Sequence, residues 1–213
     1  MLDHHNNNNA FINLNRLSSY FSIQACSVYL VGGCLRDSLL NRPIHDFDLA
    51  TSESPHRFGP ELAKDLGATY VNLNSQPDIG RIIVKPIIDL EESALNNDGS
   101  TTALTIDLSE FSGEITDNLT TRDFTVDSMA LNILDCQNLA WRDFILDPLN
   151  GLQDLFSKKI RATSYSIFIA DPGRLLRAVR LAAQLGFVIE PDTAMNIKTH
   201  AALITRVSGE RIR

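Results

Sequence analysis

The stretch YLVGGCLRDSLLNRPIHDFDLAT, which begins at Tyr29, constrains the fold of this chain more than any other segment. It opens with an apolar, β-prone run that ends at Gly32 and Gly33, where a helical pattern starts. After a proline turn, a second strand-like run carries Asp46 and Asp48, two positions apart. Strand side chains alternate between faces, so these two carboxylates point to the same side. The stretch therefore predicts a strand–helix–strand unit with paired aspartates.

This unit has the chemistry of a site for a nucleoside triphosphate held with Mg²⁺. Two carboxylates about 6–7 Å apart along a strand repel each other, and a divalent cation between them relieves the repulsion. Gly32 and Gly33 leave the backbone bare at a helix N-terminus, where free N–H groups and the helix dipole favour phosphate oxygens. Each half alone has a plainer explanation, because Gly-Gly is often a tight turn and Asp-x-Asp is common in solvated strands.

The distribution of charge indicates two different halves. The chain has 213 residues and a net charge of −7, which by itself argues against nucleic-acid binding. Residues 1–150, however, have a net charge of −12, and residues 151–213 have one of +5. This asymmetry fits an enzyme that binds metal in one region and a polyanion in the other, or a chance difference between solvated helices.

The sequence shows none of the signals of a membrane or secreted protein. No apolar run approaches the roughly 20 residues that span a bilayer, and the N-terminus lacks the basic and apolar regions of a secretory signal. The three cysteines form no CxxC pair, which favours a reduced compartment. We therefore expect a cytoplasmic protein with no membrane partner.

The first 150 residues alternate between helical and strand-like patterns. A helix is expected from Pro55 to about Gly67, since proline suits the first turn of a helix. Strands are expected at residues 68–73, 80–84 and 103–108, with a polar turn at 74–78, a loop at 90–102, and two more short strands between residues 131 and 146. This pattern predicts an α/β (α+β) fold with a mixed sheet.

From Gly151 the periodicity becomes helical, so we place a domain boundary near residues 149–152. One helix has arginines at every third position on its polar side, and further helices are expected from Pro191 and Ser208. The apolar stripe of the arginine-bearing helix is expected to comprise Leu175, Leu176, Val179, Ala182, Ala183 and Leu185.

The pattern Gly-Gly-x-x-Arg-Asp followed by Asp-x-Asp resembles the head domain of the nucleotidyltransferase superfamily. More narrowly, it is similar to the class II tRNA nucleotidyltransferases (CCA-adding enzymes) and the bacterial poly(A) polymerases. The resemblance implies an N-terminal tail and lead-in helix at residues 1–26, a catalytic head with a mixed sheet and flanking helices at 27–150, and an α-helical neck at 151–213. The family continues into a helical body and tail, so we expect this chain to be truncated before them.

The resemblance also implies roles for residues of the head. Asp46 and Asp48 would bind two Mg²⁺ ions, and the segment IDLSEFSG, which begins at Ile106, is similar to the family segment that carries a third acid, here Asp107. Without the resemblance, the spacing favours Asp107 as a solvent-facing strand residue. The nucleotide, in particular its triphosphate, would be held by Gly32, Gly33, Arg36 and Asp37.

Two later segments resemble the nucleotide-binding motifs of the family. In LTTRDFTVDSMA, Arg122 and Asp123 match residues that hold the nucleotide, although a surface ion pair would explain them too. In ADPGRLLRAVR, Asp171 and Arg174 match the pair that reads the edge of the incoming base, and Asp171 also suits a helix cap. Further matches to the family's arginines are Arg177 and Arg180. Between these segments, Asp147, Gly151 and Asp154 are interpreted as structural turn and cap residues.

The implied function is Mg²⁺-dependent addition of CMP or AMP, from CTP or ATP, to the 3′ end of tRNA. The sequence does not choose between CCA addition, CC-only addition, A-only addition and poly(A) synthesis. A non-catalytic nucleotide- or RNA-binding module with the same fold is the alternative from a different class. It is favoured by four departures from the family pattern, at Ser112, Thr121, Asp127 and Ala170.

Overall fold

The computed structural model describes residues 8–44, 46–75, 78–84 and 104–209, and its contacts divide the chain into two units. The first unit comprises Met1–Ile115 and Leu131–Ile145, and the second comprises Thr116–Ala130 and Leu146–Arg213.

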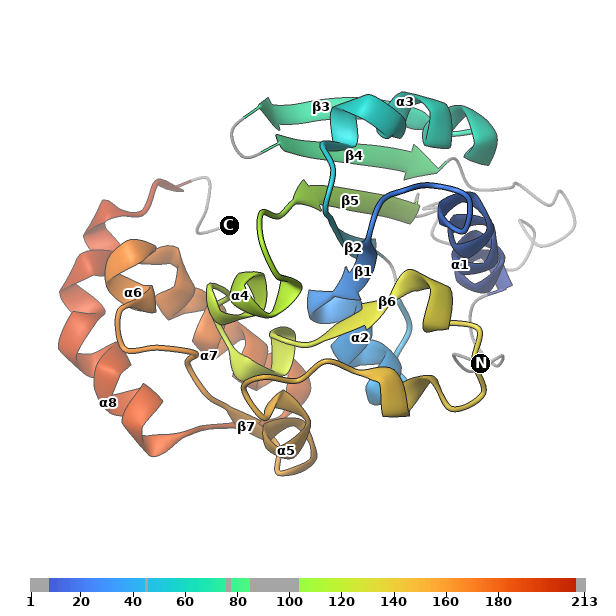
Figure 1. Ribbon diagram of the computed structural model, residues 1–213. Helices are drawn as coiled ribbons and strands as arrows, with labels where there is room; N and C mark the ends of the chain where they lie inside the picture. The colour runs from blue at the N-terminus through green and yellow to red at the C-terminus, as the bar shows by residue number, and fades with distance from the viewer. Residues whose placement is uncertain (1–7, 45, 76–77, 85–103, 210–213) are drawn as a thin grey trace, which may run out of the picture. The chain divides into compact units, whose positions relative to one another are not determined.

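The first unit is built on a six-stranded mixed sheet with the order β3-β4-β5-β2-β1-β6 (Figure 1). Strand β2 pairs in parallel with β5 and antiparallel with β1, while β4 pairs antiparallel with both β3 and β5. The strands are β1 (Val28–Val31), β2 (Asp46–Thr51), β3 (Thr69–Ser75), β4 (Asp78–Val84), β5 (Leu104–Glu110) and β6 (Ala130–Asn132). The helices of this unit are α1 (Asn8–Phe21), α2 (Gly32–Leu39) and α3 (Pro55–Leu66), with 3₁₀ turns η2 (Ile133–Asp135) and η3 (Trp141–Phe144).

The core of this unit lies against one face of the sheet. Along β2, Phe47 and Leu49 are buried, while Asp46 is exposed and Asp48 is half-buried, as the two-residue alternation of a strand requires. On β5, Ile106 is likewise fully buried. The face that carries the aspartates is therefore left accessible.

The strand and helix predictions for this unit are largely confirmed, with two corrections. The polar turn expected at residues 74–78 is shorter, because β3 extends to Ser75 and β4 begins at Asp78. Only one strand, β6, lies between residues 131 and 146, where two were expected, and the chain then forms the turns η2 and η3. The expected loop at 90–102 lies outside the described residues.

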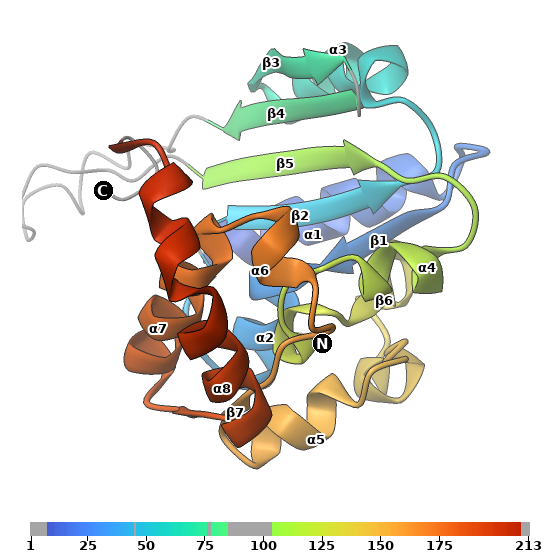
Figure 2. The ribbon, with the colours of Figure 1, turned by 90° about the vertical axis from the view of Figure 1, so that its left-hand side faces the viewer.

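The second unit is mainly helical, and Figure 2 shows its helices α6, α7 and α8 near one another. Its helices are α4 (Ile115–Thr120), α5 (Gly151–Phe156), α6 (Ile167–Ala170), α7 (Gly173–Leu185) and α8 (Pro191–His200), with 3₁₀ segments η1 (Thr125–Asp127) and η4 (Ala201–Arg206). Two short strands, β7 (Lys159–Ile160) and β8 (Val188–Ile189), pair in parallel. The helix expected from Ser208 lies mostly outside the described residues.

The apolar stripe expected on α7 is partly wrong. Leu175 is buried as expected, but Leu176 and Val179 are 37% and 54% exposed. The buried face consists of Leu175, Ala178 and Leu181, three residues apart. Apolar residues occur on two sides of this helix, so periodicity alone could not decide which side packs inward.

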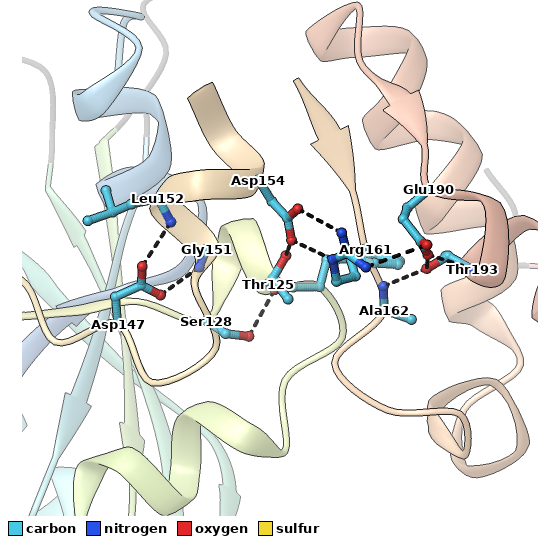
Figure 3. A network of polar contacts seen from close by, with 11 residues as sticks. Thr125, Ser128, Asp147, Gly151, Leu152, Asp154, Arg161, Ala162, Glu190 and Thr193 are labelled. Atoms are coloured by element: carbon cyan, nitrogen blue, oxygen red, sulfur yellow. Dashed lines mark hydrogen bonds and ion pairs between the residues drawn. The ribbon is translucent and has the colours of Figure 1, made fainter. Parts of the chain in front are cut away.

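A polar network joins α5, η1, the residue that follows β7 and the start of α8 (Figure 3). The Asp154 carboxylate accepts hydrogen bonds from Thr125 Oγ1, at 2.8 Å, and from Arg161 Nε, at 2.9 Å. Arg161 also lies 3.5 Å from the Glu190 carboxylate. Asp154 is therefore structural, as expected, but it binds side chains and does not act as a cap. The expected cap is Asp147, which accepts from the backbone N–H groups of Gly151 and Leu152 (Figure 3).

The carboxylate of Glu190 caps α8 and makes the stability of this unit depend on pH. Burial by itself raises the pKa of Glu190, but hydrogen bonds from Thr193 and the backbone of Asp192, together with the charge of Arg161, outweigh burial and lower it. A carboxylate with a lowered folded pKa contributes stability above the pKa of the unfolded chain. That contribution is lost as the pH falls through the lower, folded value.

We expect Glu190→Gln to destabilise the protein near neutral pH, and we expect this difference to shrink below about pH 4.3, the ordinary pKa of glutamate. Urea unfolding midpoints measured from about pH 6 to about pH 3 would check this. A difference between wild type and Glu190→Gln that stays constant with pH would contradict the role of Glu190.

Candidate active site

The carboxylates expected at the site lie on neighbouring strands of the first unit. Asp48 on β2 and Asp107 on β5 are directly paired in register, and Asp46 lies two residues before Asp48 on the same strand face. Neighbouring strands are about 4.8 Å apart, so the three side chains lie near one another on one face of the sheet. The structure thus brings together the three acids that the sequence singled out.

The glycine turn lies next to these acids. Val31, the last residue of β1, is paired with Asp48, and Gly32 follows it as the first residue of α2. Gly32 has φ +70°, a left-handed conformation that suits glycine. Val31 occupies the cap position of α2 and makes no side-chain hydrogen bond to the first turn. The N-terminal turn of α2 therefore begins beside Asp48 without a side-chain cap.

Arg36 and Asp37 form a pair on α2. Arg36 donates to both carboxylate oxygens of Asp37, at 3.0 and 2.9 Å, and its side chain is only 10% exposed. A Cβ atom at Gly33 would lie 3.3 Å from the guanidinium of Arg36, so the arginine lies close to the glycine turn. This arrangement fixes the guanidinium of Arg36 near the start of the helix.

The acidic cluster contains a basic residue that the sequence analysis missed. Arg81 on β4 is the register partner of Asp107, and it donates to both oxygens of that carboxylate, at 2.6 and 2.7 Å. The hydrogen bond to Asp107 and the charges of Asp107, Asp46 and Asp48 raise the pKa of Arg81, against a smaller opposing effect of burial. Thr105 Oγ1 donates a hydrogen bond to Asp46.

These residues fit a divalent cation in part. Carboxylate oxygens on one strand face are the ligands that Mg²⁺ prefers, and Asp46 and Asp48 provide them. Within the described part of the chain, no three acidic, histidine or cysteine side chains form a group that could hold a metal ion as they stand. Both oxygens of the third acid, Asp107, are bound to Arg81. Asp107 as a metal ligand therefore stays a prediction.

The second unit contains a separate polar cavity of about 420 Å³. Its lining includes all six residues that the two later motifs singled out, together with one glycine: Arg122, Asp123, Asp171, Gly173, Arg174, Arg177 and Arg180. Four arginines and two aspartates give the lining an excess of positive charge, which favours an anionic ligand. Its volume lies within the range of small-molecule sites.

The aspartates of this cavity organise its arginines. Asp123 accepts from the Nε of Arg177 at 2.7 Å, and the buried Asp127 lies 3.5 Å from the same guanidinium. Asp127 is one of the departures from the family pattern, so this chain holds Arg177 between two carboxylates. Asp171 accepts from the N–H of Gly173 at 3.0 Å. The cap position of α7 is occupied by Pro172, one residue after the expected cap at Asp171.

Arg174 and Arg180 are the more available cations of the cavity. Arg174 makes a long contact, of 3.5 Å, to the carbonyl of Thr121, and Arg180 is exposed. Because Arg177 is committed to Asp123 and Asp127, these two arginines and Asp171 are the groups best placed to meet a ligand.

A sheet with an Asp-x-Asp strand beside a glycine-started helix is the arrangement of a nucleotidyltransferase head. The chain belongs to the family of the poly A polymerase head domain, whose profile matches residues 28–161. A second profile, described as the probable RNA and SrmB-binding site of polymerase A, matches residues 186–213.

Named relatives agree with this family. A CC-adding tRNA nucleotidyltransferase from Geobacter sulfurreducens is 34% identical over 186 residues, which cover 87% of this chain and 38% of the relative. A CCA-adding enzyme from Streptococcus uberis is 34% identical over 197 residues, covering 86% of this chain and 43% of the relative. The chain thus spans about two fifths of the length of these relatives.

Solved structures show the same fold. The Thermotoga maritima CCA-adding enzyme complexed with tRNA_CCA superposes with a TM-score of 0.76 at 26% identity, covering 96% of this chain and 45% of that one. A CCA-adding enzyme in complex with ATP gives a TM-score of 0.73 at 26% identity, with the same coverage. The predicted fold class and the predicted family resemblance are therefore confirmed.

Proposed function

We propose that this chain carries the catalytic part of an RNA nucleotidyltransferase, which uses Mg²⁺ to add CMP or AMP, from CTP or ATP, to the 3′ end of tRNA. One observation supports this most strongly: Asp48 and Asp107 are register partners, and the uncapped start of α2 adjoins them. Membership of the poly A polymerase head family and the names of the relatives point to the same chemistry. We assign residues 27–150 to the head and 151–213 to the neck, and expect a cytosolic location.

In this proposal the acids of the first unit hold the cation. Asp46 and Asp48 would supply carboxylate ligands, and Asp107 would supply a third. Bound Mg²⁺ would polarise the phosphates and lower the pKa of the attacking 3′-hydroxyl. The protein's own part is to fix the carboxylates on a rigid sheet, so that their geometry needs no reorganisation during the reaction.

The start of α2 would hold the triphosphate. Its backbone N–H groups and the positive end of its dipole favour phosphate oxygens, and the glycines let the phosphates approach closely. Arg36 lies near this turn, and its two hydrogen bonds to Asp37 fix the position of its guanidinium. Arg36 and Asp37 would therefore act together to position the triphosphate.

The cavity of the second unit would receive the base. A carboxylate such as Asp171 accepts from an exocyclic amine, and a guanidinium such as Arg174 donates to a ring nitrogen or carbonyl. Cytosine and adenine both present an exocyclic amine beside a ring-nitrogen acceptor, so one pair of side chains can serve CTP and ATP. Arg122 and Arg180 supply positive charge to the same cavity.

The test is incorporation of labelled nucleotide by the purified chain into a tRNA that lacks its 3′-terminal CCA. CTP and ATP are offered singly and together, with a tRNA that ends in CCA as the matched control. We expect metal-dependent incorporation into the shortened tRNA and little into the complete one. Which nucleotides are used would identify the type of addition, and long A tracts on both tRNAs would indicate the poly(A) polymerase alternative.

A non-catalytic module is the second candidate, and the Arg177 contacts favour it most. Asp127 adds a carboxylate that the family pattern lacks, and it ties a predicted nucleotide-binding arginine to the protein. Calorimetry separates the two functions: Mg²⁺-dependent binding of CTP or ATP without incorporation into any tRNA would contradict the enzyme proposal.

A further inference from the structure

Arg81 lies in the same row of residues as the acids of the proposed metal site. Across β4, β5 and β2, the register partners are Arg81, Asp107 and Asp48. Register partners on adjacent strands point to the same face of a sheet, so all three side chains lie on the accessible face. Asp107 is thus placed between a guanidinium on one side and a carboxylate on the other.

The contact between Arg81 and Asp107 uses both oxygens of the carboxylate. Nε and Nη2 donate to Oδ1 and Oδ2, at 2.6 and 2.7 Å, in the parallel fork that makes arginine–carboxylate pairs strong and directional. The two side chains are 41% and 32% exposed, so water and ions can reach the pair. A cation ligated by Asp107 would share these oxygens with Arg81, and the like charges of the cation and the guanidinium would repel each other.

The charges of this cluster favour an exchange of Arg81 for a divalent cation. One guanidinium faces three carboxylates, and Arg81 interacts electrostatically with Asp46 and Asp48 as well as with Asp107. A single positive charge therefore compensates the repulsion between the acids only in part. A divalent cation at the same place would compensate more of it, and its attraction to the carboxylates is opposed by the charge of Arg81.

We propose that Arg81 is a positioning residue of the metal site, which holds Asp107 in place until a divalent cation takes over that carboxylate. The inference rests on the proposed function, because it requires the acids to bind metal. Arg81 then has two effects: it keeps the third ligand ordered without metal, and it lowers the affinity for the metal. Neither effect follows from the presence of the acids alone.

The first test measures Mn²⁺ binding to the full chain by electron paramagnetic resonance, without nucleotide or RNA. We expect Arg81→Met, which keeps the length of the side chain but removes its charge, to bind Mn²⁺ about tenfold more tightly than wild type. Arg81→Lys, which keeps the charge, should show a smaller gain. Arg57→Met is the matched control, since Arg57 forms an exposed pair with Glu53 on the same unit and should leave the affinity unchanged. An unchanged or weaker affinity in Arg81→Met would overturn the proposal.

A double-variant cycle tests whether the effect passes through Asp107. In the Asp107→Asn background, Arg81→Met should give only a small part of the gain that it gives in wild type. An equal gain in both backgrounds would overturn the proposed exchange and leave only a general charge effect. Asp48→Asn separates this inference from the proposed function. If Asp48→Asn loses Mn²⁺ binding but Arg81→Met does not bind Mn²⁺ more tightly than wild type, the role of Arg81 is refuted and the metal site of the proposed function stands. Absence of Mn²⁺ binding in wild type would overturn both.

Discussion

Replacing Asp48 by asparagine is expected to lower nucleotide incorporation by about a thousandfold or more, without unfolding the protein. Asp48 is the central acid of the cluster, being the register partner of Asp107 and the strand neighbour of Asp46. Asparagine keeps the shape of the side chain but removes the charge that holds a hard cation. The measurement is the initial rate of labelled CMP or AMP incorporation into tRNA lacking CCA, at saturating Mg²⁺.

Two controls make this result specific. Asp143→Asn removes the same charge from an exposed position of the first unit and should leave the rate unchanged. Circular dichroism and the unfolding midpoint should match wild type in both variants, because Asp48 is only half-buried. Incorporation by Asp48→Asn at a rate within a few-fold of wild type would rule out Asp48 as a metal ligand.

Gly151→Ala is expected to cause the largest loss of stability, about 3 kcal/mol. A Cβ atom at Gly151 would lie 2.1 Å from the carbonyl oxygen of Thr125 and 2.9 Å from its carbonyl carbon. These are backbone atoms and cannot rotate away as the end of a side chain could. The Thr125 backbone is further fixed by its N–H, which donates to the carbonyl of Arg161 at 3.0 Å.

The measurement is the free energy of unfolding of the second unit in urea, followed by circular dichroism. Gly209→Ala is the matched control: no atom lies within 4 Å of the added Cβ, so the change should stay within about 0.5 kcal/mol. If Gly151→Ala unfolds at the same urea concentration as wild type, α5 does not pack against Thr125 as described.

Much of the fold could be predicted, because the alternation of polar and apolar residues in the sequence agrees with which side chains are buried in the structure. The spacing of Asp46 and Asp48 predicts that their carboxylates share one side of β2, and the burial of Phe47 between them agrees with this. The prediction of a second strand before residue 146 was wrong, because the chain there makes only an isolated bridge, between Ala130 and Leu146. Short apolar runs near turns do not reveal whether a neighbouring strand is available to pair with them.

The candidate site could be predicted only where its residues lie in recognisable segments. The two aspartates of β2 and the glycines of α2 come from one short stretch, and Asp107 follows from the family resemblance. Arg81 could not be found in this way, because its role depends on the register between β4 and β5, whose paired residues are 26 positions apart. The contact of Asp127 with Arg177, which spans 50 positions, was hidden for the same reason.

The central claim is that Asp46, Asp48 and Asp107 share a divalent cation beside the N-terminal turn of α2. A crystal structure of the protein with Mn²⁺ and CTP or ATP tests it directly, through the anomalous scattering of the metal. We predict an anomalous peak within about 2.3 Å of carboxylate oxygens of Asp46 and Asp48, with the triphosphate on the backbone N–H groups that follow Gly32. A nucleotide bound with its metal away from these carboxylates would contradict the claim.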